Sequence, residues 1–531
     1  MKPGKHLKVS IRLHSVHVLL TLVALLACST NLLAQKETVE EGELWNTAEL
    51  PASAVWRYGA TDRNPKAIGA YALAFSSDGK KLAVRDRRQH IRVLNIEEQK
   101  LQALIASQSV YALTFSPDDK YIVSGNRNTT QLWNASDGEL IRELKQPSWK
   151  LAKSHNPPRL ILMGKGTAYD YPWPLPSKPK TTRTKLEGRT ILPAGTSEDG
   201  SIAVFHNGGK MEILSTVDGA QIVPPNKIVA KKVIISPNDN LMAQINYGDK
   251  ILKVFDLRDA KKYGYRLADD RRIVTAAFSN DSRFLYSSNY DHSIVIWDLV
   301  TMKAIDRIEG HAGTIYALAS SPQLFCLASG ASGASDRSVI FWNFRDHLFP
   351  EIDGEQEFLF DRVWTRMGSD DPKESLAATN LLYRQLQRDE SVMDLLTKRL
   401  GLYAEQEKES AKQWIEDLDD RKVQVRENAT RMLKAIVSQI RPMLERELKD
   451  GSQEAKWRIQ KILKIDQLKP SISTPAGRRE HRVILALELL GDANAIRTLE
   501  LVSQKTSNQN LVNSATLALQ RLKKNSETQS Q

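Results

Sequence analysis

The 531-residue chain has few of the residues and motifs that build metal, redox or nucleotide sites. It has two cysteines, Cys28 and Cys326, which form neither a disulfide framework nor a Cys/His zinc spacing, and we expect Cys326 to be a small buried residue. Its ten histidines are scattered, and it has no glycine-rich phosphate loop and no HExxH motif. We therefore expect no metal, no cofactor and no enzymatic activity.

The chain also lacks a strong charge bias. Its net charge is +12, but residues 1–34 carry four basic residues and no acid, and without them 71 basic and 63 acidic residues leave a charge of +8. A bias this small over the rest of the chain does not indicate nucleic acid. A hydrophobic content of 41% and a charged content of 26% are ordinary for a folded soluble protein.

The most apolar stretch, residues 18–27, is ten residues long with Thr21 among nine apolar residues, whereas a membrane span needs about 20. Basic residues precede it and small or polar residues follow, which predicts an export signal over residues 1–34 and then an acidic linker over 35–52. Three outcomes stay open, and each places the rest of the chain outside the cytoplasm: cleavage after Ala34, a lipid on Cys28 within Leu25-Leu26-Ala27-Cys28, or an uncleaved anchor over Val16–Ala34.

The segment Arg272–Phe344 contains the same unit twice. Each copy has an alternating apolar run, a polar turn, a second apolar run, and an Asp six residues before a Trp, namely Asp291 before Trp297 and Asp336 before Trp342. The second copy opens with Gly310-His311. This pattern is typical of a four-stranded propeller blade, and it resembles the WD40 repeat.

The Trp342 position can be followed backwards through the chain. Its counterparts are separated by 45, 42, 41, 81 and 39 residues, and they are Trp297, Phe255, Leu214, Trp133 and Leu94. Because the gap of 81 equals two repeats, we expect a degenerate blade whose third strand lies near Thr167–Trp173. This predicts a seven-bladed β-propeller over residues 53–345. We expect Ser53–Ala60 to close the ring as the outer strand of blade 7, since an open ring exposes an unpaired edge.

The WD40 resemblance assigns structural roles to the most conspicuous residues. It implies a hydrogen-bonded network of His311, Ser329, Asp336 and Trp342 in blade 7. In blade 6 it implies a partial network, because Asp291 and Trp297 are present without a matching Gly-His. A Ser, a His and an Asp in one blade would also suit a hydrolase triad, but the repeat explains these residues, so we assign no catalytic residue.

One face of the ring carries a weak functional signal. The turns between the second and third strands and the loops that enter the first strands should lie on this face. We predict a partner-binding set there, suited to an acidic peptide, a polyanion or a headgroup: Arg85, Arg87, Arg88, Lys231, Lys232, Arg271 and Arg272. The alternative is that these are solvated loop charges, offset in part by Asp86, Asp269 and Asp270.

After Phe344 the apolar period changes from two to 3.6, which predicts helices. Asp371-Pro372 is a helix start, and Gly401 and Gly451 are helix ends. We expect a helical domain over residues 355–524, with Trp414 and Trp457 buried between helices, and a disordered tail over residues 525–531.

The helical third resembles the HEAT-like domain that follows the propeller in certain bacterial WD40-repeat proteins. The matching features are Arg426-Glu427-Asn428-Ala429 on one helix, Glu454 with Arg458 on the next, and Arg482 with Glu488 on a third. This resemblance implies Arg–Glu pairs on helix faces and brings no enzymatic activity with it.

Together these patterns predict a β + α multidomain protein that acts as a non-enzymatic, exported protein-interaction scaffold. Two alternatives stay open. One is a cell-envelope polymer or carbohydrate binder that uses the basic face or the Pro/aromatic segment around Trp173, and the other is an enzyme whose site is dispersed over several blades. We expect protein partners, no nucleic acid, and a possible membrane tether through Cys28 or the uncleaved signal.

Overall fold

The computed structural model of the chain describes residues 45–529 with short gaps. The gaps are 47–49, 61–68, 108, 156, 165–166, 176–181, 186–191, 198, 208–209, 219, 227–231, 247, 258–264, 334, 350–357, 401–404, 436, 468–474 and 507–508. The predicted signal, Cys28 and Lys231 therefore lie outside the described residues, as does most of the predicted linker. Within the described part of the chain, no helix is both long and apolar enough to cross a membrane.

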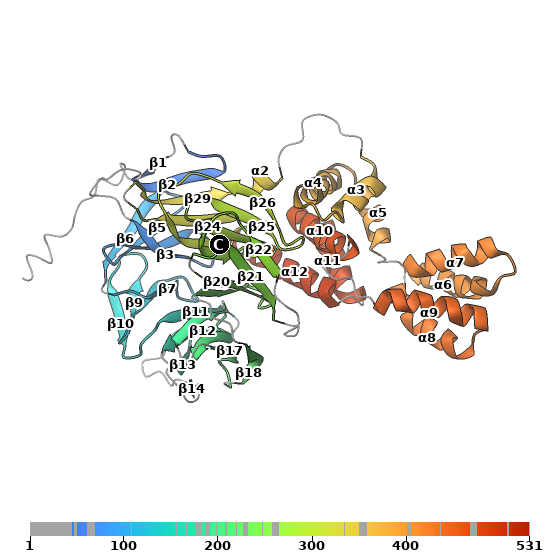
Figure 1. Cartoon of the computed structure of the whole chain (residues 1–531), viewed down its shortest axis with the longest axis horizontal. Coiled ribbons are helices and arrows are strands. Elements are labelled where there is room, and N and C mark those ends of the chain that lie inside the picture. The colour runs from blue at the N-terminus through green and yellow to red at the C-terminus, as the bar shows by residue number, and fades with distance from the viewer. Residues whose placement is uncertain are drawn as a thin grey trace, which may run out of the picture. The chain divides into compact units, whose positions relative to one another are not determined.

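Seven antiparallel sheets follow one another along the chain and form a ring (Figure 1). The first strand of each sheet packs against the first strands of its two neighbours, so these strands line the inner side of the ring. The seven-bladed propeller is thus confirmed. A short strand, β1 (Trp45–Asn46), precedes it.

Blades 1 to 4 contain the following strands: β3 (Ala70–Phe75), β4 (Lys81–Asp86), β5 (His90–Asn95), β6 (Lys100–Ala106); β7 (Ala112–Phe115), β8 (Tyr121–Gly125), β9 (Thr130–Asn134), β10 (Leu140–Leu144); β11 (Lys150–His155), β12 (Pro158–Gly164), β13 (Thr167–Pro172), β14 (Thr182–Lys185); β15 (Leu192–Thr196), β16 (Ile202–Asn207), β17 (Lys210–Ser215), β18 (Gln221–Asn226). Strand β13 is the third strand of the degenerate blade, at the predicted place.

Blades 5 to 7 contain the following strands: β19 (Lys232–Ile235), β20 (Leu241–Ile245), β21 (Ile251–Asp256), β22 (Tyr265–Ala268); β23 (Ile273–Phe278), β24 (Phe284–Asn289), β25 (Ile294–Asp298), β26 (Lys303–Ile308); β27 (Ile315–Ser320), β28 (Cys326–Ala331), β29 (Arg337–Asn343), with β2 (Ala54–Ala60). Cys326 is buried and unbonded, as predicted.

A serine turn joins the first and second strands of most blades. In blade 2 the Ser116 hydroxyl donates to Asp118 Oδ1 at 2.6 Å, and in blade 5 the Ser236 hydroxyl donates to Asn238 Oδ1 at 2.7 Å. The same hydroxyl also accepts a hydrogen bond from the backbone N–H that opens the second strand, for example that of Tyr121 at 3.0 Å. These side-chain bonds explain why the repeat carries a Ser-x-Asp or Ser-x-Asn turn here.

Strand β2 closes the ring by pairing antiparallel with β29, with Tyr58 opposite Val339. Trp56 is 1% exposed and stacks on Phe341, with 5.3 Å between ring centroids. We call the junction between blade 7 and blade 1, which β2 closes, the seam. There a Cβ added to Gly330 would lie 2.5 Å from the Ala70 Cβ, so glycine lets blade 7 approach blade 1. The prediction that residues 53–60 supply the outer strand of blade 7 is confirmed.

The described part after the propeller contains eleven α-helices and one 3-10 turn. They are α2 (Arg345–Leu348), α3 (Phe360–Met367), α4 (Pro372–Arg388), α5 (Ser391–Arg399), α6 (Glu405–Glu416), η2 (Asp417–Asp419), α7 (Val423–Ala435), α8 (Val437–Asp450), α9 (Gln453–Gln467), α10 (Pro475–Leu490), α11 (Ala493–Lys505) and α12 (Gln509–Gln529).

The Asp371-Pro372 helix start is confirmed, because the Asp371 carboxylate accepts from the backbone N–H groups of Lys373 and Glu374 at the start of α4. The expected disordered tail is wrong for residues 525–529, since α12 continues to Gln529. The helices form two apolar cores, one shared by α3, α4, α5, α10, α11 and α12 and the other by α6 to α9.

We expected Trp457 to be buried between helices, and this is wrong, because it is 49% exposed. The buried side of α9 carries Ala455, Ile459 and Ile462, and at 3.6 residues per turn Trp457 lies on the opposite side. The Lys461 ammonium lies 3.6 Å from its ring centroid. Trp414, by contrast, packs partly buried against this core.

Buried ion pairs join the helical region to blade 6. Arg482 of α10 is fully buried, and its guanidinium donates to Asp298 Oδ2 at 2.6 Å. Glu488, also on α10, accepts from Arg283 at 2.7 Å and from Arg521 of α12 at 2.6 Å. Around these charges Leu376 and Leu485 join the buried aromatic cluster of blades 6 and 7.

We predict that the seam strand carries a large share of propeller stability. Trp56→Ala should lower the free energy of unfolding by about 4 kcal/mol, because a fully packed indole is lost. Its neighbour Val55 is 43% exposed, so Val55→Ala should change it by less than about 0.5 kcal/mol. Urea unfolding followed by tryptophan fluorescence measures both, and equal effects would contradict the seam's importance.

We also predict a pH dependence from Glu488. Burial alone would raise its pKa, but the charges of Arg283 and Arg521 outweigh burial and lower the pKa from 4.5 to about 2. As the pH falls, Glu488 is therefore protonated in the unfolded chain before it is protonated in the folded chain. The stability that the ionised Glu488 contributes is full above pH 4.5 and is lost between pH 4.5 and pH 2. Over this range the native chain should lose about 3 kcal/mol more stability than Glu488→Gln in pH-dependent urea unfolding. If the stabilities of the native chain and of Glu488→Gln fall in parallel with pH, this prediction is refuted.

Candidate partner-binding face of the propeller

One end of the ring is formed by two kinds of connection. These are the loops that lead into the first strands and the turns between the second and third strands. Backbone hydrogen bonds join them, from Tyr290 N to Arg272 O at 2.9 Å in blade 6 and from Ser332 N to Thr314 O at 3.0 Å in blade 7. Both kinds of connection therefore lie on one face, which we call the upper face.

The structure scatters the predicted basic residues over the upper face. Arg87 and Arg88 are exposed in the turn after β4, and Arg272 is exposed before β23. Arg271 is exposed too, but it pairs with Asp270 at 3.4 Å and Asp291 at 3.3 Å. The described members lie on or just before strands of blades 1, 5 and 6, and their role in partner binding stays a prediction.

The two remaining described members, Arg85 and Lys232, are partly buried. Arg85 donates to Val110 O at 2.8 Å, and burial lowers the pKa of its guanidinium. Lys232 Nζ donates to Thr275 Oγ1. Burial, and then the charge of Lys150, lower the pKa of Lys232 to about 8. Each of these two side chains is thus tied to the neighbouring blade, Arg85 to Val110 ahead of β7 and Lys232 to Thr275 in β23.

The upper face carries a row of aromatic side chains that sequence reasoning missed. It comprises Tyr316, Tyr71, Tyr111 and Trp149, which lie at the start of the first strands of blades 7, 1, 2 and 3. Tyr71 stacks on Tyr316 at 5.5 Å between centroids, and Tyr111 stacks on Trp149 at 5.8 Å. The three tyrosines are 37–48% exposed. The signal in the sequence was the tyrosine repeated in YALAF, YALTF and IYALA.

Guanidinium groups lie over this aromatic row. The Arg85 guanidinium carbon is 5.4 Å from the Tyr71 centroid, and that of Arg127 is 5.4 Å from Tyr111 and 5.7 Å from Trp149. Such contacts hold rings and cations in fixed positions by cation–π attraction. The row is therefore a rigid apolar surface with positive charge beside it.

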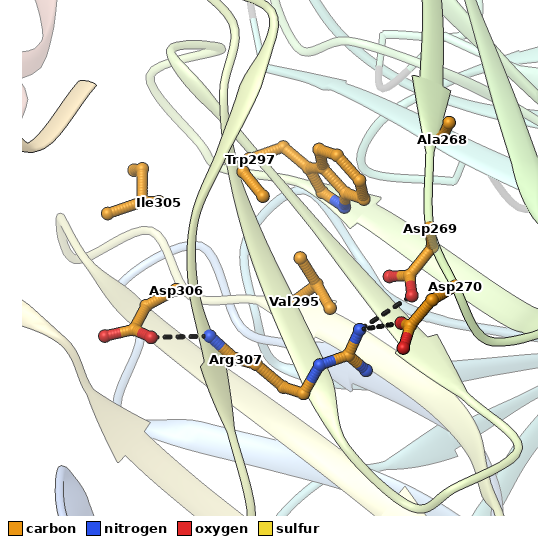
Figure 2. Close-up of a pocket in the computed structure, with 9 residues that line it drawn as sticks. Ala268, Asp269, Asp270, Val295, Trp297, Ile305, Asp306 and Arg307 are labelled. Atoms are coloured by element: carbon orange, nitrogen blue, oxygen red, sulfur yellow. Dashed lines mark hydrogen bonds and ion pairs between the residues drawn. The ribbon is translucent and has the colours of Figure 1, made fainter. Parts of the chain in front are cut away.

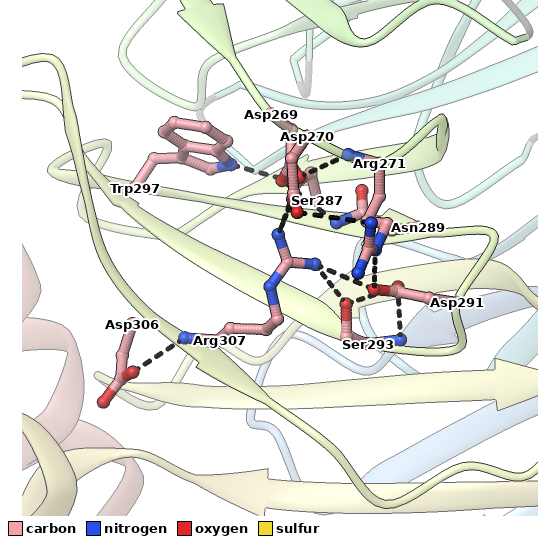
Figure 3. Close-up of polar contacts among 10 residues, drawn as sticks. All are labelled: Asp269, Asp270, Arg271, Ser287, Asn289, Asp291, Ser293, Trp297, Asp306 and Arg307. Atoms are coloured by element: carbon pink, nitrogen blue, oxygen red, sulfur yellow. Dashed lines mark hydrogen bonds and ion pairs between the residues drawn. The ribbon is translucent and has the colours of Figure 1, made fainter.

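In blade 6, Arg307 forms ion pairs with three carboxylates (Figure 3). Arg307 lies 2.7 Å from Asp269, 2.8 Å from Asp270 and 3.1 Å from Asp291. Burial opposes the charge of Arg307, but the bonds to Asp269 and the other carboxylates outweigh it and raise its pKa. Trp297 Nε1 donates to Ser287 Oγ at 2.9 Å. Blade 6 thus keeps a Trp–Ser bond, while Asp291 bonds to Ser293 and Arg307 in an ion-pair cluster.

A pocket of about 260 Å³ lies beside this cluster (Figure 2). Its lining consists of Ala268, Asp269, Asp270, Val295, Trp297, Ala304, Ile305, Asp306 and Arg307. The lining has three carboxylates, Asp269, Asp270 and Asp306, against one guanidinium, Arg307, so it is acidic overall, and Arg307 is already bound to Asp269 and Asp270. Within the described residues, no group of His, Cys, Asp and Glu has the geometry to hold a metal ion.

Blade 7 contains the full hydrogen-bonded chain that the resemblance implied. His311 lies 2.7 Å from Asp336 through Nδ1 and 2.7 Å from Ser329 through Nε2, and Trp342 Nε1 donates to Ser329 Oγ at 2.7 Å. The side chains of His311 and Asp336 are fully buried, as is Ser329. The arrangement has the order of a hydrolase triad, but Ser329 is fully buried and its hydroxyl already accepts a hydrogen bond from the Trp342 indole.

Trp173, the aromatic residue of the proposed polymer-binding segment, is 8% exposed. It packs edge-on against Tyr121, with 5.8 Å between centroids. The indole is therefore part of the blade 2–blade 3 core and is not available to stack on a sugar.

Comparison with known proteins bears on the repeats. A family model described as "WD domain, G-beta repeat" matches residues 98–134, 265–298 and 302–343. These segments are WD40 repeats. The matches fall on blades whose third strands contain Trp133, Trp297 and Trp342, the tryptophans from which the repeat was traced.

Relatives of this chain include two eukaryotic proteins. Protein tipD of Dictyostelium discoideum is 26% identical over 331 residues, which is 57% of this chain and 51% of tipD. The guanine nucleotide-binding protein subunit beta of Saccharomyces cerevisiae is 30% identical over 63 residues, 12% of this chain and 15% of that protein. The chain thus matches about half of one relative and a small part of the other.

Among solved structures, the Cps50 (Swd1) β-propeller domain of Myceliophteria thermophila is similar to this chain, with a TM-score of 0.43 and 15% identity. The similarity covers 52% of this chain and 96% of that domain.

We predict that Arg307 is needed to hold the acidic cluster of blade 6 together. Arg307→Leu leaves Asp269, which is 2% exposed, without its cation and should cost about 2 kcal/mol of stability. Arg271→Leu removes a 55% exposed partner of the same cluster and should cost less than about 0.5 kcal/mol. Thermal unfolding of the two variants decides this, and equal melting temperatures would show that Arg307 has no special role.

Proposed function

We propose that this chain is a non-enzymatic protein-interaction scaffold whose WD40 propeller docks a partner segment on the aromatic row. The observation that carries the proposal is the row itself, with four rings from consecutive blades, stacked in pairs and partly open to solvent. Aromatic residues and arginine are the side chains enriched at protein interfaces, and they dominate binding hot spots.

The rigidity of the row supports this use. Stacking and cation–π contacts fix Tyr71 and Tyr111 before a partner arrives, so little side-chain entropy is lost on binding. The helical region supplies a second partner surface in this proposal. Its most conspicuous exposed residue is Trp457, covered on one side by the Lys461 ammonium.

We further propose that the protein is exported from the cytoplasm and acts in the cell envelope or outside the cell. The support is the basic and apolar composition of residues 1–34. Intact mass of the protein from its native cell tests this. A chain that begins at Gln35 or at a lipidated Cys28 supports export, and a Met1 start in a cytoplasmic fraction contradicts it. The bacterial source that the helical resemblance implies stays a prediction, and it rests on that resemblance alone.

We predict that the double variant Tyr71→Ala/Tyr111→Ala loses the partner. In affinity capture after cross-linking in the native cell, its yield of the specific partner should fall at least tenfold, because each lost ring removes about 1–2 kcal/mol of interface energy. Leu140→Ala on β10, an equally exposed apolar residue at 49%, should capture as much as the native chain. Equal capture by all three would refute docking on the row, and recovery of envelope polymer without protein would favour the polymer binder.

A further inference from the structure

Two lysines lie at the inner rim of the upper face. Lys150 is the first residue of β11 in blade 3, and Lys232 is the first residue of β19 in blade 5. The first strands line the inside of the ring and all begin at the upper face, so both side chains start from the same end of it. Trp149, the last member of the aromatic row, directly precedes Lys150.

Neither lysine has an ionic partner within the described residues. The Lys232 ammonium donates to the neutral hydroxyl of Thr275 in blade 6. Burial lowers the pKa of both ammonium groups, and the charge of Lys150 lowers that of Lys232 further. Each lysine is nevertheless only partly buried, so an incoming group can reach it.

A pair of mutually repelling, partly desolvated cations is unfavourable unless an anion joins them. Placing two ammonium groups close together without a carboxylate costs stability, whereas an anion between them gains attraction from both at reduced dielectric constant. Elsewhere in the ring the protein supplies such partners, as with Lys153, which lies 3.3 Å from Asp119. At the rim the described residues supply none.

We propose that Lys150 and Lys232 form a carboxylate-binding site for an acidic side chain of the partner segment that docks on the aromatic row. This inference rests on the proposed function and specifies its partner. The segment crosses the stacked rings of blades 7, 1, 2 and 3 and places a Glu or Asp side chain at the inner rim. Thr275 completes the site as a hydroxyl beside the Lys232 ammonium.

The test uses the full chain and a fluorescein-labelled peptide of one tyrosine followed by six glutamates, with affinity measured by fluorescence anisotropy. Lys150→Met/Lys232→Met should bind this peptide at least tenfold more weakly than the native chain. Lys100→Met should bind within twofold of it, since Lys100 is 66% exposed on the outer strand β6 and far from the rim in the blade. The double variant should keep its melting temperature or raise it, because it loses unpaired charge, and this shows that it is folded.

The outcomes separate the two proposals. If the lysine variant binds as tightly as the native chain while Tyr71→Ala/Tyr111→Ala binds tenfold more weakly, the carboxylate site is overturned and the docking row stands. If neither variant weakens binding, both are overturned. If millimolar inorganic phosphate displaces the labelled peptide from the native chain as effectively as unlabelled peptide does, the site binds small anions. The proposal that it binds a side chain of the partner is then overturned.

Discussion

The pairing of β2 with β29 is the constraint on which the rest of the molecule depends. It brings a segment from the start of the propeller beside the last blade, so that blades 7 and 1 become neighbours. The aromatic row crosses this seam, because Tyr316 belongs to blade 7 and Tyr71 to blade 1. Tyr316 and Tyr71 are 245 positions apart in the sequence, so their side chains stack only when the propeller is closed. The candidate docking surface is therefore a property of the assembled propeller.

The second constraint is electrostatic. Arg482, Arg283 and Glu488 are buried between the helical region and blade 6, and each has an oppositely charged partner within 2.7 Å. Buried pairs of this kind contribute little net stability compared with apolar packing, but a misplaced helix would leave charges unpaired at a cost of about 3–5 kcal/mol. Their main effect is therefore on geometry, since they fix one way for α10 to lie against the propeller.

Periodicity and turn chemistry predicted most of the fold. The strand anchors, the degenerate third blade, the seam strand and the Asp371 cap all depend on local patterns, which sequence displays directly. The aromatic row and the Arg307 cluster went unpredicted because their members come from different strands or blades. Trp457 was misjudged because composition favours burial of tryptophan, whereas its position on α9 places it opposite the apolar side. The residues of the basic set were found but their pairings were not, since Arg271 binds Asp270 and Asp291 and Arg85 donates to Val110 O.

The geometry of the seam also has a mechanical consequence. In an antiparallel pair, the start of β2 and the end of β29 lie at the same end of the ladder, where Ala54 faces Trp342. Tension applied between the segment before Ala54 and the segment after Asn343 therefore loads one pair of hydrogen bonds at a time, as in opening a zipper, and not the whole ladder in shear. A chain held at its amino-terminal end and pulled through its helical region would open blade 7 at low force and separate Tyr71 from Tyr316, so the docking surface would be sensitive to pulling.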